Sequence, residues 1–212
     1  MGVLMTALTA DKAAAWMADF AASIAENAEL LTDLDRQIGD ADHGSNMNRG
    51  MKAVCALGSE FPDAPALLKK VGMTLVNSVG GASGPLYGTF FLRLAKELPS
   101  SGDATPEVWG KALRAGLQGI LDRGKAKVGD KTMVDALTPA VDAYDEAVTG
   151  GAEFGQALQA AAAACAEGRD STVDLVAHKG RASYLGERSK GVQDPGATSV
   201  TLLLESAART LA

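Results

Sequence analysis

The chain has 212 residues, of which 47% are hydrophobic, and it carries a formal net charge of −6 at pH 7. This length suits one well-packed core, so we expect residues 1–212 to form a single domain. The acidity and the scattered Lys and Arg residues argue against a nucleic-acid partner, because binding to a phosphate backbone requires a clustered basic surface.

Membrane and secreted proteins are also disfavoured. No apolar run reaches the roughly 18–20 residues that a membrane-spanning helix requires. The stretch from Met1 to Leu8 lacks the basic leader and the length of a secretory signal. Cys55 and Cys165 both fall in apolar helical patterns, which predicts buried free thiols rather than a disulfide. We therefore expect a cytoplasmic protein that does not enter the membrane.

Most of the chain repeats apolar residues at three- and four-residue intervals, which is typical of amphipathic helices. No stretch has the alternating, β-branched pattern of a strand. The predicted helices cover residues 9–38, 45–57, 64–79, 86–98, 105–123, 133–148, 154–176 and 197–211. Eight such helices with mostly short connections predict an all-α, up-and-down antiparallel bundle.

The connection after the first predicted helix concentrates acidic residues between glycines. Asp35 ends the helix, and Asp40 and Asp42 follow in the turn. Carboxylates on a turn suit a hard divalent ion such as Mg²⁺ or Ca²⁺. The alternative is a solvated turn in which Asp42 or Ser45 caps the next helix. The spacing does not fit an EF-hand, and His43 as the single nearby nitrogen donor does not fit a zinc site.

The connection Gly80–Pro85, with the sequence Gly-Gly-Ala-Ser-Gly-Pro, has two interpretations. Small residues at a helix N-terminus let backbone N–H groups approach a phosphate, and the helix dipole favours the anion. The same residues are also common where one helix ends with a glycine C-cap and the next begins with a proline in its first turn. The segment lacks the Gly-Lys-Ser/Thr end of a P-loop, so both interpretations stay open.

Two later connections are basic. Lys125–Thr132 is rich in Gly and Lys, and His178–Ser199 is the longest irregular segment of the chain. A connection of that length inside a helical domain is more often functional than idle. Arg181 is the best cationic candidate for binding a phosphate, since its side chain stays charged and can bind in a bidentate manner.

Topology predicts that these segments meet. In a strictly alternating bundle, the connections after the first, third, fifth and seventh predicted helices share one end. They are the acidic turn, Gly80–Pro85, Gly124–Thr132 and the basic segment Lys179–Pro195. The three aspartates supply about −3, two divalent metals +4 and a nucleoside diphosphate about −3, so a phosphate-bearing nucleotide bridged through Mg²⁺ is a plausible guest of this rim.

Four motifs resemble, in order, those of the nucleotide-binding L subunit of bacterial dihydroxyacetone kinase, of the phosphotransferase-system-dependent type. The resemblance covers nearly the whole chain. The motifs are Asp35-x4-Asp40-Ala41-Asp42-His43-Gly44-x-Asn46, Gly80-Gly81-Ala82-Ser83-Gly84, Gly129-Asp130-Lys131-Thr132-Met133, and Gly180-Arg181-Ala182-Ser183-Tyr184-Leu185-Gly186 with Asp194-Pro195-Gly196-Ala197.

This resemblance implies a closed barrel of eight antiparallel helices with ADP or ATP and two Mg²⁺ ions at one end. It assigns the metal ions to Asp35, Asp40 and Asp42. Arg181 and His43 are the implied residues in contact with the transferred phosphate, His43 through a hydrogen bond or by orienting a carboxylate rather than as a covalent acceptor. The implied nucleotide contacts are His43, Gly44, Ser45, Asn46, Ala82, Ser83, Gly124, Met133, Arg181, Asp194, Pro195 and Gly196.

The resemblance also implies partners. The phosphoryl group would pass to dihydroxyacetone held on a separate K subunit. ADP would be rephosphorylated in place by a phosphohistidine on an M subunit, or exchanged for ATP, and a homodimer is a further assembly left open. Phosphoryl transfer depends on positioning and charge neutralisation, so the lack of an evident nucleophile–base pair is expected.

Other functions remain as alternatives. The sugar could be a related ketose such as erythrulose, because no sugar site is visible in this sequence. A Mg²⁺-dependent helical enzyme that cleaves diphosphates is another, although such enzymes usually need carboxylates from two helices and only one cluster is present. A third is a metal-dependent binding module without chemistry.

Overall fold

The computed structural model describes residues 8–212, so the expectation about a leader in Met1 to Leu8 lies outside this range except for Leu8. No β-strand occurs between residues 8 and 212, which confirms the all-α prediction. The α-helices are α1 (Ala10–Glu26), α2 (Ala28–Ile38), α3 (His43–Cys55), α4 (Ala64–Ser78), α5 (Ser83–Glu97), α6 (Pro106–Gly124), α7 (Met133–Thr149), α8 (Phe154–Ser171) and α9 (Pro195–Thr210). Two 3-10 segments, η1 (Thr172–Asp174) and η2 (Arg181–Ser189), lie between α8 and α9.

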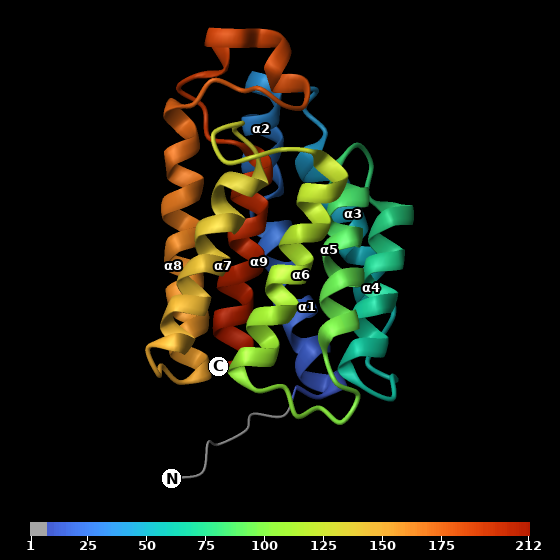
Figure 1. The fold of residues 1–212 in the computed structure, drawn as a ribbon. Coiled ribbons are helices and arrows are strands. Elements are labelled where there is room, and N and C mark those ends of the chain that lie inside the picture. Colours follow the sequence, from blue (N-terminus) through green and yellow to red (C-terminus); the bar gives the residue numbers. More distant parts are fainter. Residues whose placement is uncertain (1–7) are drawn as a thin grey trace.

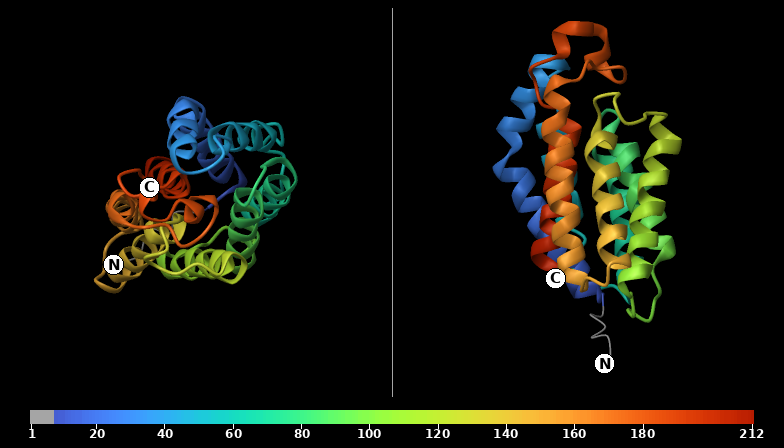
Figure 2. Two further views of the ribbon diagram at one scale, coloured as in Figure 1. Left: turned by 90° about the horizontal axis from the view of Figure 1, so that it is seen from above. Right: turned by 60° about the vertical axis from the view of Figure 1, so that its left-hand side comes forward.

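The helices run up and down around a ring (Figures 1 and 2). Each helix from α3 to α8 packs against the next helix in the sequence. The last helix, α9, packs against α1 and α2, which closes the ring. The segment containing η2 lies over one end of the ring, and the C-terminus lies at the opposite end (Figure 1). Within residues 8–212, no helix combines the length and apolarity that crossing a membrane requires.

The structure divides the first predicted helix into α1 and α2 at Asn27. The Asn27 side chain donates a hydrogen bond to the Ser23 carbonyl at 2.8 Å, and its backbone N–H donates to the same oxygen at 3.1 Å. The Asn27 backbone leaves the helical conformation at φ −101° and ψ 9°, and its side chain shares the Ser23 carbonyl with the backbone N–H, which the apolar periodicity cannot reveal. The eight predicted spans therefore appear as nine helices in the described residues.

Two other local expectations are wrong. Cys55 is exposed at the end of α3, whereas Cys165 is buried as predicted. The helix predicted to reach residue 176 ends at Ser171 and continues only as η1, so His178 lies in a loop rather than at a helix C-terminus. In both places the apolar pattern extends past the residues that actually face the core.

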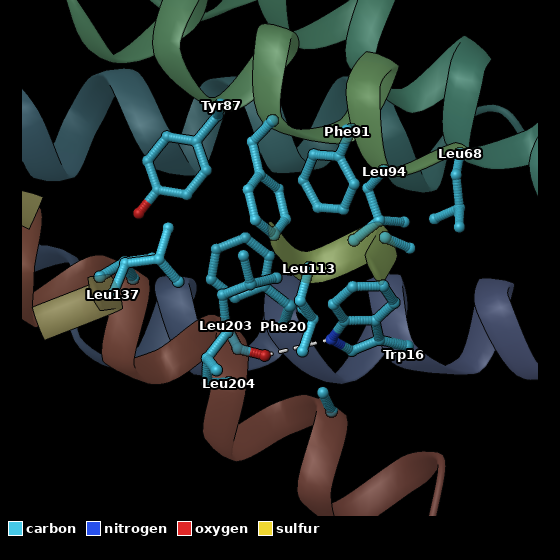
Figure 3. Close-up of a cluster of buried hydrophobic side chains, with 14 of the residues drawn as sticks. Trp16, Phe20, Leu68, Tyr87, Phe91, Leu94, Leu113, Leu137, Leu203 and Leu204 are labelled. Carbon is cyan, nitrogen blue, oxygen red and sulfur yellow. Dashed lines mark hydrogen bonds between the residues drawn. The ribbon is translucent and has the colours of Figure 1, made fainter. Parts of the chain in front are cut away.

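Aromatic side chains from several helices fill the centre of the ring. Trp16 of α1 lies with its ring centroid 5.7 Å from that of Phe91 and 5.6 Å from that of Trp109. Its indole N–H donates to the backbone carbonyl of Leu203 on α9 at 3.1 Å, as Figure 3 shows. Burying such large apolar groups supplies most of the stability of the ring, and the indole hydrogen bond joins the first helix to the last.

Glycines inside helices allow close approach. A Cβ at Gly72 of α4 would lie 2.8 Å from the backbone oxygen of Gly88 on α5 and 2.9 Å from the Leu92 side chain. Glycine lowers helix propensity, so its presence in the middle of α4 is offset by tighter packing of the two backbones.

We predict that Gly72→Ala lowers the free energy of unfolding by about 1–3 kcal/mol through overpacking, although alanine raises helix propensity by about 1 kcal/mol. Gly155→Ala is the matched control, because its Cβ would meet only the C-terminal residue Ala212, at 3.0 Å. Chemical denaturation of both variants is the measurement. Equal or greater stability of Gly72→Ala would show that α4 and α5 are not packed as described.

Candidate functional site

One cavity of about 480 Å³ lies at the end of the ring covered by η2. The four connections predicted to share a rim all contribute to it, which confirms the topological argument. Its lining includes Asp35, Ile38, Gly39, Asp40, Asp42, His43 and Asn46 from α2, the first connection and α3, and Gly80, Gly81, Ala82, Ser83 and Leu86 from the second connection and α5. The remainder is Ile120, Gly124, Ala126, Lys131, Thr132, Met133 and Val134, with Lys179, Gly180, Arg181, Ala182, Asp194, Pro195 and Gly196.

The predicted metal ligands come together in this cavity. Asp35, Asp40 and Asp42 each offer a carboxylate oxygen, and these oxygens lie within 4.8 Å of one another. Anionic groups at such a separation repel unless a cation lies among them. Hard oxygen donors are those that Mg²⁺ and Ca²⁺ prefer, so the donor set fits a divalent ion held by these side chains. Arg181 provides a partial counter-charge, since its Nε lies 2.9 Å from a carboxylate oxygen of Asp40.

Asp35 also builds the turn that carries the other two aspartates. One of its carboxylate oxygens accepts the backbone N–H of Asp42 at 2.8 Å and that of His43 at 3.1 Å. These bonds occupy N–H groups at the start of α3 that would otherwise lack an acceptor. Ala41, between Asp40 and Asp42, adopts φ +62°, a backbone conformation that costs about 1 kcal/mol or more for a residue with a Cβ. The surrounding hydrogen bonds hold this strained turn.

Gly39 is required where the turn leaves α2. A Cβ there would lie 2.0 Å from a carboxylate oxygen of Asp35. Any larger residue would displace the carboxylate that receives the two N–H groups. The glycine seen in the sequence as a helix end is thus also a condition for the acidic cluster.

His43 is buried at the wall of the cavity between two hydroxyl groups. Its Nε2 lies 2.8 Å from the Ser199 hydroxyl oxygen, and its Nδ1 lies 3.2 Å from that of Ser83. Burial lowers the pKa of His43, against the opposing charges of Asp35 and Asp42. The imidazole is therefore neutral at neutral pH, and both of its ring nitrogens are already engaged.

The N-terminus of α5 at the cavity wall has no side-chain cap. Its N-cap residue is Ala82, whose side chain cannot accept a hydrogen bond from the first-turn N–H groups. By contrast, Asp194 caps α9 by accepting the Ala197 N–H at 2.7 Å. A helix N-terminus without a side-chain acceptor, placed in a cavity, suits an anionic group such as a phosphate.

Part of the lining is apolar. Leu86, Ile120, Met133 and Val134 present aliphatic side chains to the cavity. A cavity that combines carboxylates, a free helix N-terminus and aliphatic groups suits a ligand that joins an anionic tail to a flat apolar ring.

Lys131 ties its own connection to η1 and to the basic segment, a role that the sequence did not reveal. Its side chain is 1% exposed, and its ammonium group donates to the backbone carbonyls of Thr172 and, at 2.6 Å, Val192. Burial lowers its pKa, and the charges of Asp194 and Asp135 oppose that shift. The only signal in the sequence is its place just before the N-cap of α7.

The basic segment is anchored over the cavity by its apolar residues. Ile38 of α2 packs with Ala177 and Ala182 in a second small cluster, against which Leu185 lies half-buried. Gly180 adopts φ +65°, which places Arg181 at the start of η2. The Arg181 side chain is 67% exposed, so it reaches both the acidic cluster and solvent.

Most of the predicted nucleotide contacts line the cavity. Gly44 and Ser45 do not. A Cβ at Gly44 would lie 2.0 Å from the Ala28 carbonyl of α2, and the exposed Ser45 hydroxyl donates to the Asp42 carbonyl at 2.9 Å. Both residues serve the turn, and their contact with a nucleotide stays a prediction.

The ring of helices and the cavity define a class: an all-α protein with a rim site suited to a divalent metal and a phosphate-bearing ligand. The family model described as the DAK2 domain matches residues 37–209. The chain therefore belongs to the DAK2 domain family.

Relatives of this chain include subunits of bacterial dihydroxyacetone kinases. The chain is 45% identical over 192 residues to the PEP-dependent dihydroxyacetone kinase ADP-binding subunit DhaL of Escherichia coli. The aligned residues cover 90% of this chain and 91% of that protein. It is 44% identical over 202 residues to a DhaL of Listeria innocua, covering 94% and 96%. These relatives place the chain in a family of phosphotransferases.

A solved structure supports the fold. The chain aligns with the dihydroxyacetone kinase of C. freundii with a TM-score of 0.74 and 25% identity, over 98% of this chain and 36% of that one. The same kinase has been solved in complex with AMP-PNP and Mg²⁺, and that structure aligns with a TM-score of 0.69, 26% identity and coverage of 92% and 33%. This chain thus corresponds to about a third of a longer kinase.

We predict different effects on stability for two of the aspartates. Asp35→Ala leaves two backbone N–H groups without their acceptor and lowers the free energy of unfolding by about 1–3 kcal/mol. Asp40→Ala, at an exposed position with one surface ion pair, changes it by less than about 0.5 kcal/mol. Urea denaturation without added metal compares them, and equal losses would contradict the assigned role of Asp35.

A second prediction concerns pH. Burial raises the pKa of Asp194 to about 7, from 3.8 for a free side chain. The folded state then retains a proton that the unfolded chain has lost, so this group lowers stability as pH rises from about 4 to about 7, by up to about 1.4 kcal/mol per pH unit. Asp194→Asn removes this slope.

The matched control is Asp63→Asn, which alters another N-cap whose carboxylate accepts a backbone N–H at 2.7 Å. Denaturation at about pH 5 and about pH 7 separates the two effects. If Asp194→Asn and Asp63→Asn keep the same pH dependence as the parent protein, the Asp194 carboxyl is ionised in the fold.

Proposed function

We propose that this chain is the ADP- or ATP- and Mg²⁺-binding subunit of a dihydroxyacetone kinase. It would carry the phosphoryl group to dihydroxyacetone held on a K subunit. The observation that carries the proposal is the cluster of Asp35, Asp40 and Asp42, with oxygens within 4.8 Å, in a cavity that also holds an uncapped helix N-terminus. The 45% identity to an ADP-binding subunit supports it. The proposal treats residues 1–212 as one nucleotide-binding domain.

The acidic cluster fits two Mg²⁺ ions, held by Asp35, Asp40 and Asp42. When bound, such ions neutralise phosphate charge and fix the phosphate oxygens. The chain itself supplies the remaining positive potential from the α5 N-terminus and Arg181. The aliphatic side chains of Met133 and Leu86 exclude water from the base-binding side of the cavity.

Arg181 is the residue we assign to the transferred phosphate. Its guanidinium pairs with Asp40 at 2.9 Å and is 67% exposed, so it lies between the cluster and the space above the rim. A planar cation with several donors at this place can bind a phosphate oxygen without leaving the cluster. The neutral, doubly engaged His43 has no free ring nitrogen for a covalent role.

The phosphoryl donor in the proposal is a phosphohistidine on an M subunit, which rephosphorylates ADP in place. Three bacterial relatives named as PEP- or PTS-dependent ADP-binding subunits are 41% to 45% identical to this chain. Relatives of which this chain covers about a third, such as a triokinase/FMN cyclase of Bos taurus, are 32% to 34% identical. Exchange of ADP for ATP is the alternative, and it would give a protein that releases its nucleotide readily.

Dihydroxyacetone is the proposed acceptor. A second candidate is erythrulose, because the chain is 34% identical over 186 residues to an L-erythrulose 1-kinase of Mycolicibacterium smegmatis. The higher identity to the dihydroxyacetone-kinase subunits favours the triose. The family membership also favours a kinase over the diphosphate-cleaving enzyme and over a binding module without chemistry.

Calorimetric titration with ADP in the presence and absence of Mg²⁺ tests the site. We expect Mg²⁺-dependent binding by the parent protein and a loss of at least about tenfold in affinity for Asp40→Ala and Asp42→Ala, since each variant removes a hard oxygen ligand. Asp33→Ala is the matched control, because Asp33 is an exposed α2 residue outside the cavity lining.

Unchanged binding by both cavity variants would refute the metal site. Lack of ADP binding by the parent protein would refute the proposed function itself. Gel filtration followed by mass spectrometry then decides the donor: ADP that stays bound supports rephosphorylation in place, and its complete loss supports exchange with ATP.

A further inference from the structure

The hydrogen bonds of His43 continue away from the cavity into the core. Ser199 of α9, whose hydroxyl oxygen lies 2.8 Å from His43 Nε2, also lies 2.8 Å from the hydroxyl oxygen of Tyr87 on α5. Tyr87 is 1% exposed, and Ser199 is fully buried. A chain of four side chains thus runs from Tyr87 through Ser199 and His43 to Ser83 at the cavity wall.

The direction of each bond follows from counting donors. Among residues 8–212, Ser199 is the only hydrogen-bond partner of the Tyr87 hydroxyl. Tyr87 must therefore donate, because a buried hydroxyl proton without an acceptor costs free energy. The Ser199 hydroxyl donates in turn to the Gly196 carbonyl at 3.1 Å. Its oxygen then accepts from His43, which places the imidazole proton on Nε2.

This arrangement satisfies every contact at once. With the proton on Nε2, the Nδ1 atom of His43 is an acceptor, and the Ser83 hydroxyl donates to it over 3.2 Å. The other tautomer needs the Ser199 proton for His43 and leaves the Gly196 contact unmade. A hydrogen bond at one ring nitrogen is the usual means by which proteins select the tautomer at the other.

We propose that Ser199 is a positioning residue, which holds His43 as the Nε2–H tautomer so that the Ser83 hydroxyl donates its proton to Nδ1. Ser83 then presents its lone pairs to the cavity. Lone pairs at this place could accept hydrogen bonds from water retained by a divalent ion that the acidic cluster would hold. This last step rests on the proposed function, whereas the tautomer does not.

Two elements far apart in the sequence supply this support. Tyr87 lies one helical turn after Ser83 on α5, and Ser199 lies one turn after Pro195 on α9. Figure 3 shows the Tyr87 ring at the edge of the apolar cluster, with its hydroxyl directed away from Phe91 and Leu94. The core therefore fixes the tyrosine, whose hydroxyl donates to Ser199 beside His43.

Nitrogen-15 NMR of the histidine rings tests the tautomer directly. The chain contains two histidines, so the spectrum has two ring systems, and His178→Gln assigns the other one. At a single neutral pH and without ligand, we expect His43 of the parent protein to show a protonated Nε2 and an unprotonated Nδ1. A protonated Nδ1 in the parent protein would overturn the proposal.

Variants separate the positioning role from general stability. Ser199→Ala removes the acceptor of the Nε2 proton, so it should increase the population of the Nδ1–H tautomer. Tyr87→Phe leaves that acceptor in place, so the Nε2–H tautomer should persist in this variant. The matched controls are Tyr144→Phe, whose hydroxyl donates to the Pro106 carbonyl, and Ser206→Ala, whose hydroxyl donates to the Trp16 carbonyl. A shift in Ser199→Ala no larger than that in Ser206→Ala would overturn the proposal.

The functional half is measured by calorimetry with ADP and Mg²⁺. Loss of the hydrogen bond between His43 and Ser199 should weaken binding about two- to tenfold in Ser199→Ala, with Ser206→Ala and Tyr144→Phe unchanged. Unaltered affinity despite a shifted tautomer would overturn the assigned role of Ser83. If the parent protein fails to bind ADP, the proposed function falls, and the NMR result still decides the tautomer.

Discussion

The structure of the site depends on one electrostatic constraint, the closeness of three carboxylates. Asp35, Asp40 and Asp42 place oxygens within 4.8 Å of one another, where like charges repel. The fold holds them there with the two backbone N–H groups bound by Asp35 and with a residue at positive φ in the turn. Arg181 offsets part of the charge. A divalent cation would complete the balance, and this is the ion that the proposed function assigns to the cluster.

The ring of helices explains why this cluster can be combined with distant segments. Alternating helices bring every second connection to the same end, and the aromatic core that joins α1 to α9 keeps the ring rigid. Lys131 then ties the connection before α7 to the segments on either side of η2. Flexible rim loops are thereby held in fixed positions around the cavity, which lowers the conformational entropy lost when a ligand binds.

Membership of the DAK2 domain family and the division of the cavity point to the same activity. In the proposed function, the carboxylates hold the metal ions that accompany a nucleotide. The α5 N-terminus receives its phosphates, and the aliphatic side chains receive its base. The chain offers no evident nucleophile, which agrees with a role in presenting a phosphoryl group to a partner. Behind the cavity wall, the hydroxyl chain from Tyr87 to Ser83 extends the organisation of the site into the core.

The sequence by itself determined the helical class, the helix spans apart from local boundaries, the acidic cluster and the shared rim. These follow from periodicity, caps and the alternation of helices, which are local or topological properties. Only the tertiary structure decided the break at Asn27, the exposure of Cys55, the burial of Lys131 and the partners of His43. Each of these depends on contacts between residues on different elements, or on a side chain competing with its own helix, and neither leaves a periodic trace in the chain.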